Sequence, residues 1–201
     1  MPEVDRVLGN DEKLKAENYI PSRENHRVFV SDIMKVRKIA GHPISGFDSQ
    51  TRAFVQVQQG CNHRCTFCII PFSRGNSRSV GIDFLINQVR KLTENGYGEC
   101  VLTGVDISSY GVDLPGKPSL GKLVHCILDE VPDLERLRLS SLDPAVVDDT
   151  LISLLAIEPR LMPHLHFSVQ AGNNVILKRM KRRHNRWDVI DLFMVAMTNG
   201  F

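Results

Sequence analysis

Three cysteines in one short stretch constrain this chain more than any other feature. Cys61, Cys65 and Cys68 stand in the sequence CNHRCTFC, which gives a Cx3Cx2C spacing. Thiolates this close along a chain bind a metal ion or an iron–sulfur cluster. A structural zinc site takes four protein ligands, and a cube of four irons normally takes four cysteines, so three cysteines leave one position open. A zinc site that recruits His63 as its fourth ligand is the alternative at this point.

A four-iron cluster with one open iron is the arrangement of radical S-adenosylmethionine (SAM) enzymes. In these enzymes the open iron binds SAM, and one electron from the cluster produces a 5′-deoxyadenosyl radical. Two details favour this interpretation over zinc. Phe67 precedes the third cysteine, where radical-SAM sequences usually carry an aromatic residue that packs near the adenine. The hydrophobic stretch from Ala53 to Val57 enters the loop through Gly60, as expected for a loop that follows a strand.

The cysteine count and the hydropathy indicate a location in the cytoplasm. The total of five cysteines is odd and no signal peptide is recognisable, so a disulfide framework is not expected. No apolar run approaches the roughly 20 residues that a membrane-spanning helix needs, so we expect no membrane partner. The net charge of +2 argues neither for nor against nucleic acid.

Strands and helices are predicted to alternate from about residue 50 onward. This rhythm predicts parallel βαβ units. The predicted strands are 53–58, 99–103, 136–141 and 164–170, and the predicted helices are 82–95, 119–131, 144–157, 173–183 and 186–198. We therefore expect an α/β fold, a partial radical-SAM (β/α) barrel with parallel strands and outer helices.

The predicted strands are apolar on one face and polar on the other. Val55 and Val57 alternate with Gln56 and Gln58, and the stretch from His164 to Gln170 alternates in the same way. A strand buried on both faces is apolar throughout, so one face of this sheet is expected to line an open, polar concavity. A half-exposed sheet without a pocket is the alternative.

The length of the chain limits how much of a barrel it forms. A complete (β/α)₈ barrel takes at least about 200 residues, and here about four βα units are visible after a less regular start. We expect residues 1–48 to be the remnant of another domain plus a linker, with a short helix near 12–19. Residues 49–201 are expected to be an incomplete radical-SAM core.

Several motifs resemble one family closely. The stretches FVQVQQGCNHRCTFCIIPFSRGNSRSV, VLTGVDISSYG, LRLSSLDP and HFSVQAGNNVILKRMKRRH occur in the order and spacing of radical-SAM methylthiotransferases that modify tRNA. The resemblance covers roughly residues 1 to 190. It is greatest for the branch that acts on threonylcarbamoyladenosine. Relative to that family, the sequence is expected to be truncated at both ends.

The resemblance implies roles for individual residues. Cys61, Cys65 and Cys68 are expected to bind one 4Fe-4S cluster, whereas Cys100 and Cys126 are expected to be core thiols. The residues expected near SAM or the target base are Phe67, Arg74, Gly75, Thr103, Gly104, Asp106, Ser140, Ser168 and Gln170. The structural alternatives are a turn glycine for Gly75, a turn cap for Asp106 and a hydrogen-bonded core residue for His166.

The family also implies partners. It methylthiolates carbon 2 of a modified adenosine next to the anticodon, so tRNA is the expected substrate, and a flavodoxin-like or ferredoxin-like protein is the expected electron donor. A basic run is a candidate RNA-phosphate surface and, alternatively, a solvated helix face; it contains Lys178, Arg179, Lys181, Arg182 and Arg183. The family's second cluster sits in an N-terminal domain that is missing here.

Two other functions remain open from the sequence. The chain is alternatively a different radical-SAM enzyme that uses a single cluster. From another class, it is a non-catalytic remnant or a zinc-binding module.

Overall fold

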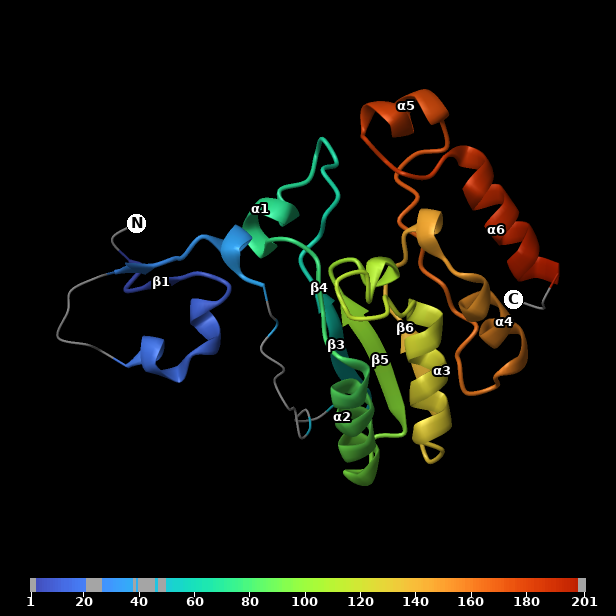
Figure 1. The fold of residues 1–201 in the computed structure, drawn as a ribbon, viewed down its shortest axis with the longest axis horizontal. Helices are drawn as coiled ribbons and strands as arrows, with labels where there is room; N and C mark the ends of the chain where they lie inside the picture. The colour runs from blue at the N-terminus through green and yellow to red at the C-terminus, as the bar shows by residue number, and fades with distance from the viewer. Residues whose placement is uncertain (1–2, 21–26, 38, 40–45, 47–49, 199–201) are drawn as a thin grey trace.

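The fold is built around a small mixed sheet, hereafter the main sheet. The computed structural model describes the whole chain apart from residues 1–2, 21–26, 38, 40–45, 47–49 and 199–201 (Figure 1). The main sheet has four strands in the order β4-β3-β5-β6. Its parallel strands are β3 (Ala53–Gln59), β5 (Glu99–Gly104) and β6 (Arg136–Leu139), and the short β4 (Arg78–Ser79) pairs antiparallel with the end of β3. The prediction of parallel βα units is confirmed, whereas β4 was not predicted.

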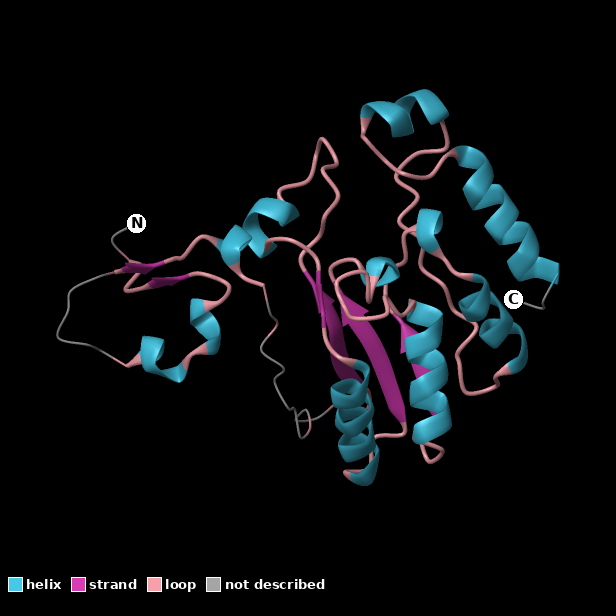
Figure 2. Ribbon diagram, viewed as in Figure 1, coloured by secondary structure: helices cyan, strands magenta, loops and turns pink. Residues whose placement is uncertain are grey.

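Two amphipathic helices cover the apolar face of the main sheet (Figure 2). In α2 (Ile82–Glu94), Leu85, Val89 and Leu92 recur at helical spacing and are fully or almost fully buried. Helix α3 (Leu120–Glu130) begins at Ser119, whose side chain accepts a hydrogen bond from the backbone N–H of Lys122. Each buried leucine contributes about 2 kcal/mol relative to exposure. Both helices fall where the periodicity predicts them.

The opposite face of the main sheet is open, as the alternating pattern predicts. On β3, Ala53, Val55 and Val57 are buried beneath the helices, whereas Phe54 and Gln56 are exposed. The carboxyl ends of β3, β5 and β6 lie at one edge of the sheet because these strands are parallel. The cysteine loop, α1 (Ile70–Arg74) and the short helix η4 (Ile107–Ser109) are all connected to this edge.

The predicted fourth strand, 164–170, does not form a continuous strand. Only isolated bridges pair Leu161 with Leu137 and Phe167 with Leu142. The backbone N–H groups of Val169 and Ala171 donate to the carbonyls of Phe167 and Val169, two residues earlier. Gln170 adopts a φ of 68°. Among the described residues, the backbone of this segment bonds to the backbone after β6 only at Leu142, and the N–H groups of Val169 and Ala171 close tight turns instead of pairing with a further strand, so alternation alone mispredicted this segment.

Two of the remaining helices are shorter than predicted. The segment predicted at 144–157 divides into η5 (Pro144–Val146) and α4 (Asp149–Ile157), because the Asp148 side chain caps a new start. The helix predicted at 173–183 ends early, as α5 (Asn174–Arg179). Lys181 then has a φ of 57°, so the basic run forms a turn rather than a helix face. Helix α6 (Arg186–Thr198) matches its predicted bounds.

The N-terminal segment has its own small sheet, drawn to one side of the main sheet in Figure 1. Strand β1 (Val7–Leu8) pairs in parallel with β2 (Val28–Phe29). The predicted helix near 12–19 is replaced by two 3₁₀ turns, η1 (Glu12–Leu14) and η2 (Ala16–Tyr19), and η3 (Ile33–Lys35) follows β2. The predicted domain boundary at residue 48 lies outside the described residues. No described helix has both the length and the apolar character needed to span a membrane.

Candidate active site

The cysteine loop leaves β3 through a sharp turn that only glycine accommodates well. Gly60 has a φ of 75°, and a Cβ at this position would lie 2.0 Å from the carbonyl oxygen of Asn76. The next residue, Cys61, donates its backbone N–H to the carbonyl of Gly75 at 3.0 Å. This pair of contacts fixes the direction in which the loop sets out across the edge of the sheet.

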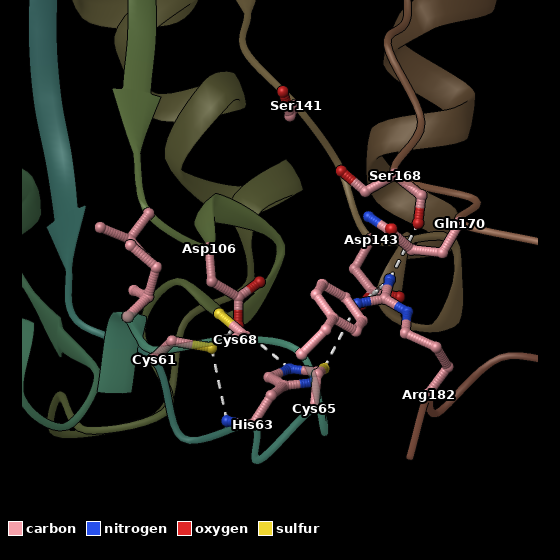
Figure 3. A pocket seen from close by; sticks show the side chains of 13 residues that line it. Cys61, His63, Cys65, Cys68, Asp106, Ser141, Asp143, Ser168, Gln170 and Arg182 are labelled. Carbon is pink, nitrogen blue, oxygen red and sulfur yellow. Dashed lines mark hydrogen bonds and ion pairs between the residues drawn. The ribbon is translucent and has the colours of Figure 1, made fainter. Parts of the chain in front are cut away.

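The three cysteines of the loop line one pocket (Figure 3). All three are free thiols; Cys65 is buried, and Cys61 and Cys68 are partly buried. The other two cysteines lie elsewhere, because Cys100 is fully buried in β5 and Cys126 is half-buried on α3. The remaining pocket lining is His63, Phe67, Ile70, Val105, Asp106, Ser141, Asp143, Ser168, Gln170 and Arg182.

Asp106 and His63 lie beside Cys61. The Oδ2 atom of Asp106 is 3.8 Å from Cys61 Sγ and 3.1 Å from His63 Nε2. Burial opposes ionisation of Asp106, but contacts with His63 and Ser109 outweigh it and hold the pKa of this carboxyl below its usual range. Burial raises the pKa of the Cys61 thiol to about 11. Burial and the nearby Asp106 carboxylate thus both favour the neutral thiol of Cys61 in this structure.

Gln58 joins the cysteine loop to the end of β5. Its side chain is fully buried, and its Oε1 atom accepts the backbone N–H groups of Val105 and Asp106 at 3.1 and 2.9 Å. Its Nε2 atom donates to the Gly60 carbonyl at 2.7 Å and to Ser77 Oγ at 2.9 Å. This one amide therefore fixes Asp106 relative to the loop that carries the cysteines.

The opposite wall of the pocket comes from the segments after β6. Asp143 follows the end of β6, and Ser168 and Gln170 lie on the tightly turned segment that replaces the fourth strand. Arg182 reaches in from the turn after α5 and forms an ion pair with Asp143, with 2.7 Å between Nη2 and Oδ2 (Figure 3). Sequence elements far apart thus meet across one pocket.

The structure brings only part of the predicted SAM set to this pocket. Phe67, Asp106, Ser168 and Gln170 line it. Gly75 has a turn role instead, with a φ of 78° after α1.

Four further members of the predicted set lie outside the pocket lining. Arg74 donates to Asn10 Oδ1 at 2.8 Å. Thr103 pairs with Gln56 within the main sheet, and a Cβ on Gly104 would lie 2.6 Å from the carbonyl oxygen of Gln58. The Ser140 hydroxyl is buried without a hydrogen-bond partner among the described residues.

Two polar and two apolar pocket residues were missed from the sequence, namely Ser141, Asp143, Ile70 and Val105, and one was misplaced. Asp143 and Ser141 follow the end of β6, and parallel sheets place ligand sites beyond the carboxyl ends of their strands, so this signal could have found them. Arg182 was predicted to face RNA, but its side chain is only 8% exposed and points into the pocket. The other four residues of that set, Lys178, Arg179, Lys181 and Arg183, are exposed.

Comparison with known protein families identifies the superfamily to which the chain belongs. The model of the radical SAM superfamily matches residues 55–201. The chain belongs to the radical SAM superfamily. Membership implies a 4Fe-4S cluster and SAM as cofactors, which makes the zinc module the weaker alternative.

The most similar relatives among those compared are tRNA-modifying enzymes. A protein of Rickettsia prowazekii named threonylcarbamoyladenosine tRNA methylthiotransferase MtaB is 51% identical over 191 residues, covering 95% of this chain and 45% of that protein. The protein of the same name from Bacillus subtilis is 37% identical, covering 92% of this chain and 41% of that protein. A tRNA-2-methylthio-N(6)-dimethylallyladenosine synthase from Clostridium tetani is 31% identical, covering 95% and 42%. The chain thus spans under half the length of these curated relatives.

Solved structures show the same fold at low sequence identity. The radical SAM methyltransferase TsrM from Kitasatospora setae, with tryptophan and a SAM analogue bound, superposes with a TM-score of 0.60 at 15% identity. The match covers 75% of this chain and 29% of TsrM. A second TsrM structure, with cobalamin and a [4Fe-4S] cluster bound, gives a TM-score of 0.59 and covers 74% of this chain and 27% of TsrM.

Proposed function

We propose that this chain is the radical-SAM part of a methylthiotransferase that modifies carbon 2 of threonylcarbamoyladenosine in tRNA. The observation that carries the proposal is the meeting of three free loop cysteines with Asp106, Ser168 and Gln170 in one pocket. The identity of 51% to a relative of that name, against 31% to the dimethylallyladenosine enzyme, favours the threonylcarbamoyladenosine branch.

The donor set of the pocket suits a cluster. Three thiols are soft ligands of the kind that iron–sulfur clusters take, and three leave one iron for another molecule. Cys61, Cys65 and Cys68 are the ligands in this proposal. When bound, the cluster supplies the electron that cleaves SAM into methionine and a 5′-deoxyadenosyl radical. In the alternative hypothesis, the same cysteines bind a zinc ion instead of a cluster.

The remaining pocket residues would bind and orient SAM. Asp106 carries a carboxylate suited to a ribose hydroxyl, and Phe67, which is 54% exposed, presents an aromatic face to an adenine ring. Ser168 and Gln170 offer hydroxyl and amide groups from the opposite wall. Gln58 and Gly104 would act indirectly, by holding the end of β5 close to the loop.

An external donor of flavodoxin or ferredoxin type would reduce the cluster. The second cluster of the family, to which sulfur insertion is ascribed, has no cysteine set in this sequence. Cys100 and Cys126 belong to separate core elements, β5 and α3. We therefore assign that cluster's ligands to residues outside this sequence. The cytoplasm is the proposed location.

Anaerobic reconstitution with iron and sulfide tests the cluster assignment. Alanine variants of Cys61, Cys65 and Cys68 should each lose an oxygen-labile four-iron cluster, because each removes one ligand. The Cys126→Ala variant is the matched control and should retain it. The measurements are iron and sulfide content and the electron paramagnetic resonance signal of the reduced protein. Retention of the full iron content by Cys65→Ala would show that the ligand assignment is wrong.

The proposed substrate is tested by measuring binding to RNA. The reconstituted, reduced chain should bind an anticodon stem-loop containing threonylcarbamoyladenosine more tightly than one containing unmodified adenosine. Equal affinities for the two stem-loops would contradict the proposed substrate. Binding of either one is expected to weaken steeply with salt, because charged contacts to phosphate release counterions.

The exposed basic residues in the last turn of α5 and just after it are the proposed phosphate contacts. An Arg179→Gln, Lys181→Gln double variant should reduce the slope of log affinity against log salt concentration by about 1.5 to 2, and leave the iron content unchanged. A Lys91→Gln, Lys122→Gln double variant, with one exposed lysine on α2 and one on α3, is a control that removes the same two charges away from this turn. If the double variant and the control have the same slope of log affinity against log salt concentration, the RNA-phosphate contacts lie elsewhere on the protein.

A further inference from the structure

The turn after α5 is tied to the cysteine loop by its backbone and by one buried side chain. Helix α5 ends at Arg179, and the carbonyl oxygen of Met180 accepts the backbone N–H of Thr66 at 3.2 Å. Lys181, with its φ of 57°, turns the chain so that Arg182 points inward between exposed neighbours. Arg182 thus approaches the cysteine loop from the opposite wall.

Three hydrogen bonds hold the guanidinium of Arg182. Its Nη2 atom donates to Asp143 Oδ2 at 2.7 Å and to the carbonyl oxygen of Ser168 at 2.9 Å. Its Nη1 atom donates to Cys65 Sγ at 3.7 Å. The Nε–H group is buried and without a hydrogen-bond partner among the described residues, so one donor stays available to an acceptor in the pocket.

Asp143, which anchors Arg182, is itself rigidly placed. Its backbone N–H donates to Ser108 Oγ at 2.7 Å, and His184 Nδ1 lies 3.6 Å from Asp143 Oδ1. Asp143 and Arg182 are each only 8% exposed. A guanidinium does not lose its proton in proteins, so a permanent positive charge is fixed beside the sulfur of Cys65.

We propose that Arg182 is a positioning residue that orients Cys65 and raises the reduction potential of the cluster. The inference rests on the proposed function, in which Cys65 is a cluster ligand. Reduction adds one negative charge to the cluster. A nearby positive charge and an N–H donor to a ligand sulfur both favour the more negative state. Arg182 thereby makes the cluster easier for an external donor to reduce.

The geometry also distinguishes Arg182 from its neighbours in the basic run. Arg179 carries the same charge only three positions away, but its side chain is exposed to solvent. Water and salt screen such a charge strongly, whereas a buried charge is screened much less. Arg179, the last residue of α5, therefore provides a matched control with the same residue type and the same change of charge.

The test is a potentiometric titration of the reconstituted cluster in the full chain. Relative to wild type, Arg182→Gln should lower the ratio of reduced to oxidised cluster about tenfold at the wild-type midpoint, which is about 59 mV for a one-electron couple. Arg182→Lys keeps the charge but not the forked donor, so it should shift the midpoint in the same direction by less. Arg179→Gln should leave it unchanged. Electron paramagnetic resonance follows the reduced cluster.

The outcomes separate this inference from the proposed function. Equal midpoints for Arg182→Gln and Arg179→Gln would overturn the role of Arg182 while leaving the cluster assignment intact. If Arg182→Gln does not retain a cluster, the Arg182→Lys variant provides the test. A midpoint potential of Arg182→Lys below that of Arg179→Gln supports the role of Arg182, and equal midpoint potentials refute it. A wild-type chain that assembles no four-iron cluster overturns the proposed function itself.

Discussion

Replacement of Gln58 by leucine should destabilise the chain through lost hydrogen bonds rather than lost packing. The Gln58 amide accepts two backbone N–H groups, from Val105 and Asp106, and donates to Gly60 and Ser77. Leucine fills a similar volume but pairs with none of them. Each buried polar group left without a partner costs about 1–3 kcal/mol. With two backbone donors orphaned, the expected loss is about 3 kcal/mol.

The assay is thermal and urea unfolding of the cluster-free chain, followed by circular dichroism. For a domain of this size, about 3 kcal/mol lowers Tm by roughly 6–12 °C. Gln56→Leu is the matched control, because Gln56 lies on the same strand with an exposed side chain. Cluster yield provides a second measurement, and it should fall for Gln58→Leu because Asp106 and the loop lose their common anchor.

Equal unfolding temperatures for Gln58→Leu and Gln56→Leu would show that the Gln58 hydrogen bonds do not stabilise the chain. Gln58→Glu gives a further check, since a carboxylate accepts both N–H groups but donates nothing to the Gly60 carbonyl when ionised. At neutral pH this variant should lie between wild type and Gln58→Leu in stability.

Two further changes have definite expected outcomes. Hydrogen bonds from Arg138 and Arg136 outweigh burial and hold the pKa of Glu99 below its ordinary value, so its contribution to stability is present at neutral pH and is lost as pH falls through the folded-state pKa. Glu99→Gln should therefore be less stable than wild type by about 1–3 kcal/mol at pH 7. In urea titrations, the difference in unfolding free energy between the two proteins should decrease below about pH 4. A difference that stays constant with pH would contradict this. Gly60→Ala should lower both Tm and cluster yield, because its Cβ would meet the Asn76 carbonyl at 2.0 Å; wild-type values for both would show that the loop relaxes at no cost.

Local sequence signals predicted the regular elements well. Helices α2 and α3 have uninterrupted apolar periodicity and clear starts, so their positions follow from hydrophobic spacing and capping. The three loop cysteines line one pocket, as their close spacing along the chain predicts. The pocket residues that follow strand ends were predicted only in part, since a strand end fixes the position of a residue but not the direction of its side chain.

The failures occurred where tertiary contacts override local pattern. The segment before Gln170 alternates like a strand, but its backbone bonds close tight turns instead. In the sequence, Arg182 cannot be distinguished from the other cations of the basic run. Its burial depends on contacts with Asp143 and Cys65, which are distant in the sequence. No window of sequence around Arg182 contains this information.

The contacts between the cysteine loop and the turn after α5 also set an order of events during folding. Thr66 and Arg179 are 113 positions apart in the sequence, and Cys65 and Arg182 are 117 apart. Contacts between residues so distant in the chain form late, because a long loop must close before they are gained. On the ribosome, the cysteines emerge well before the segment that completes their surroundings. Iron delivered before residue 182 has been synthesised therefore meets a loop without its final wall, so stable loading of the cluster belongs to the end of folding.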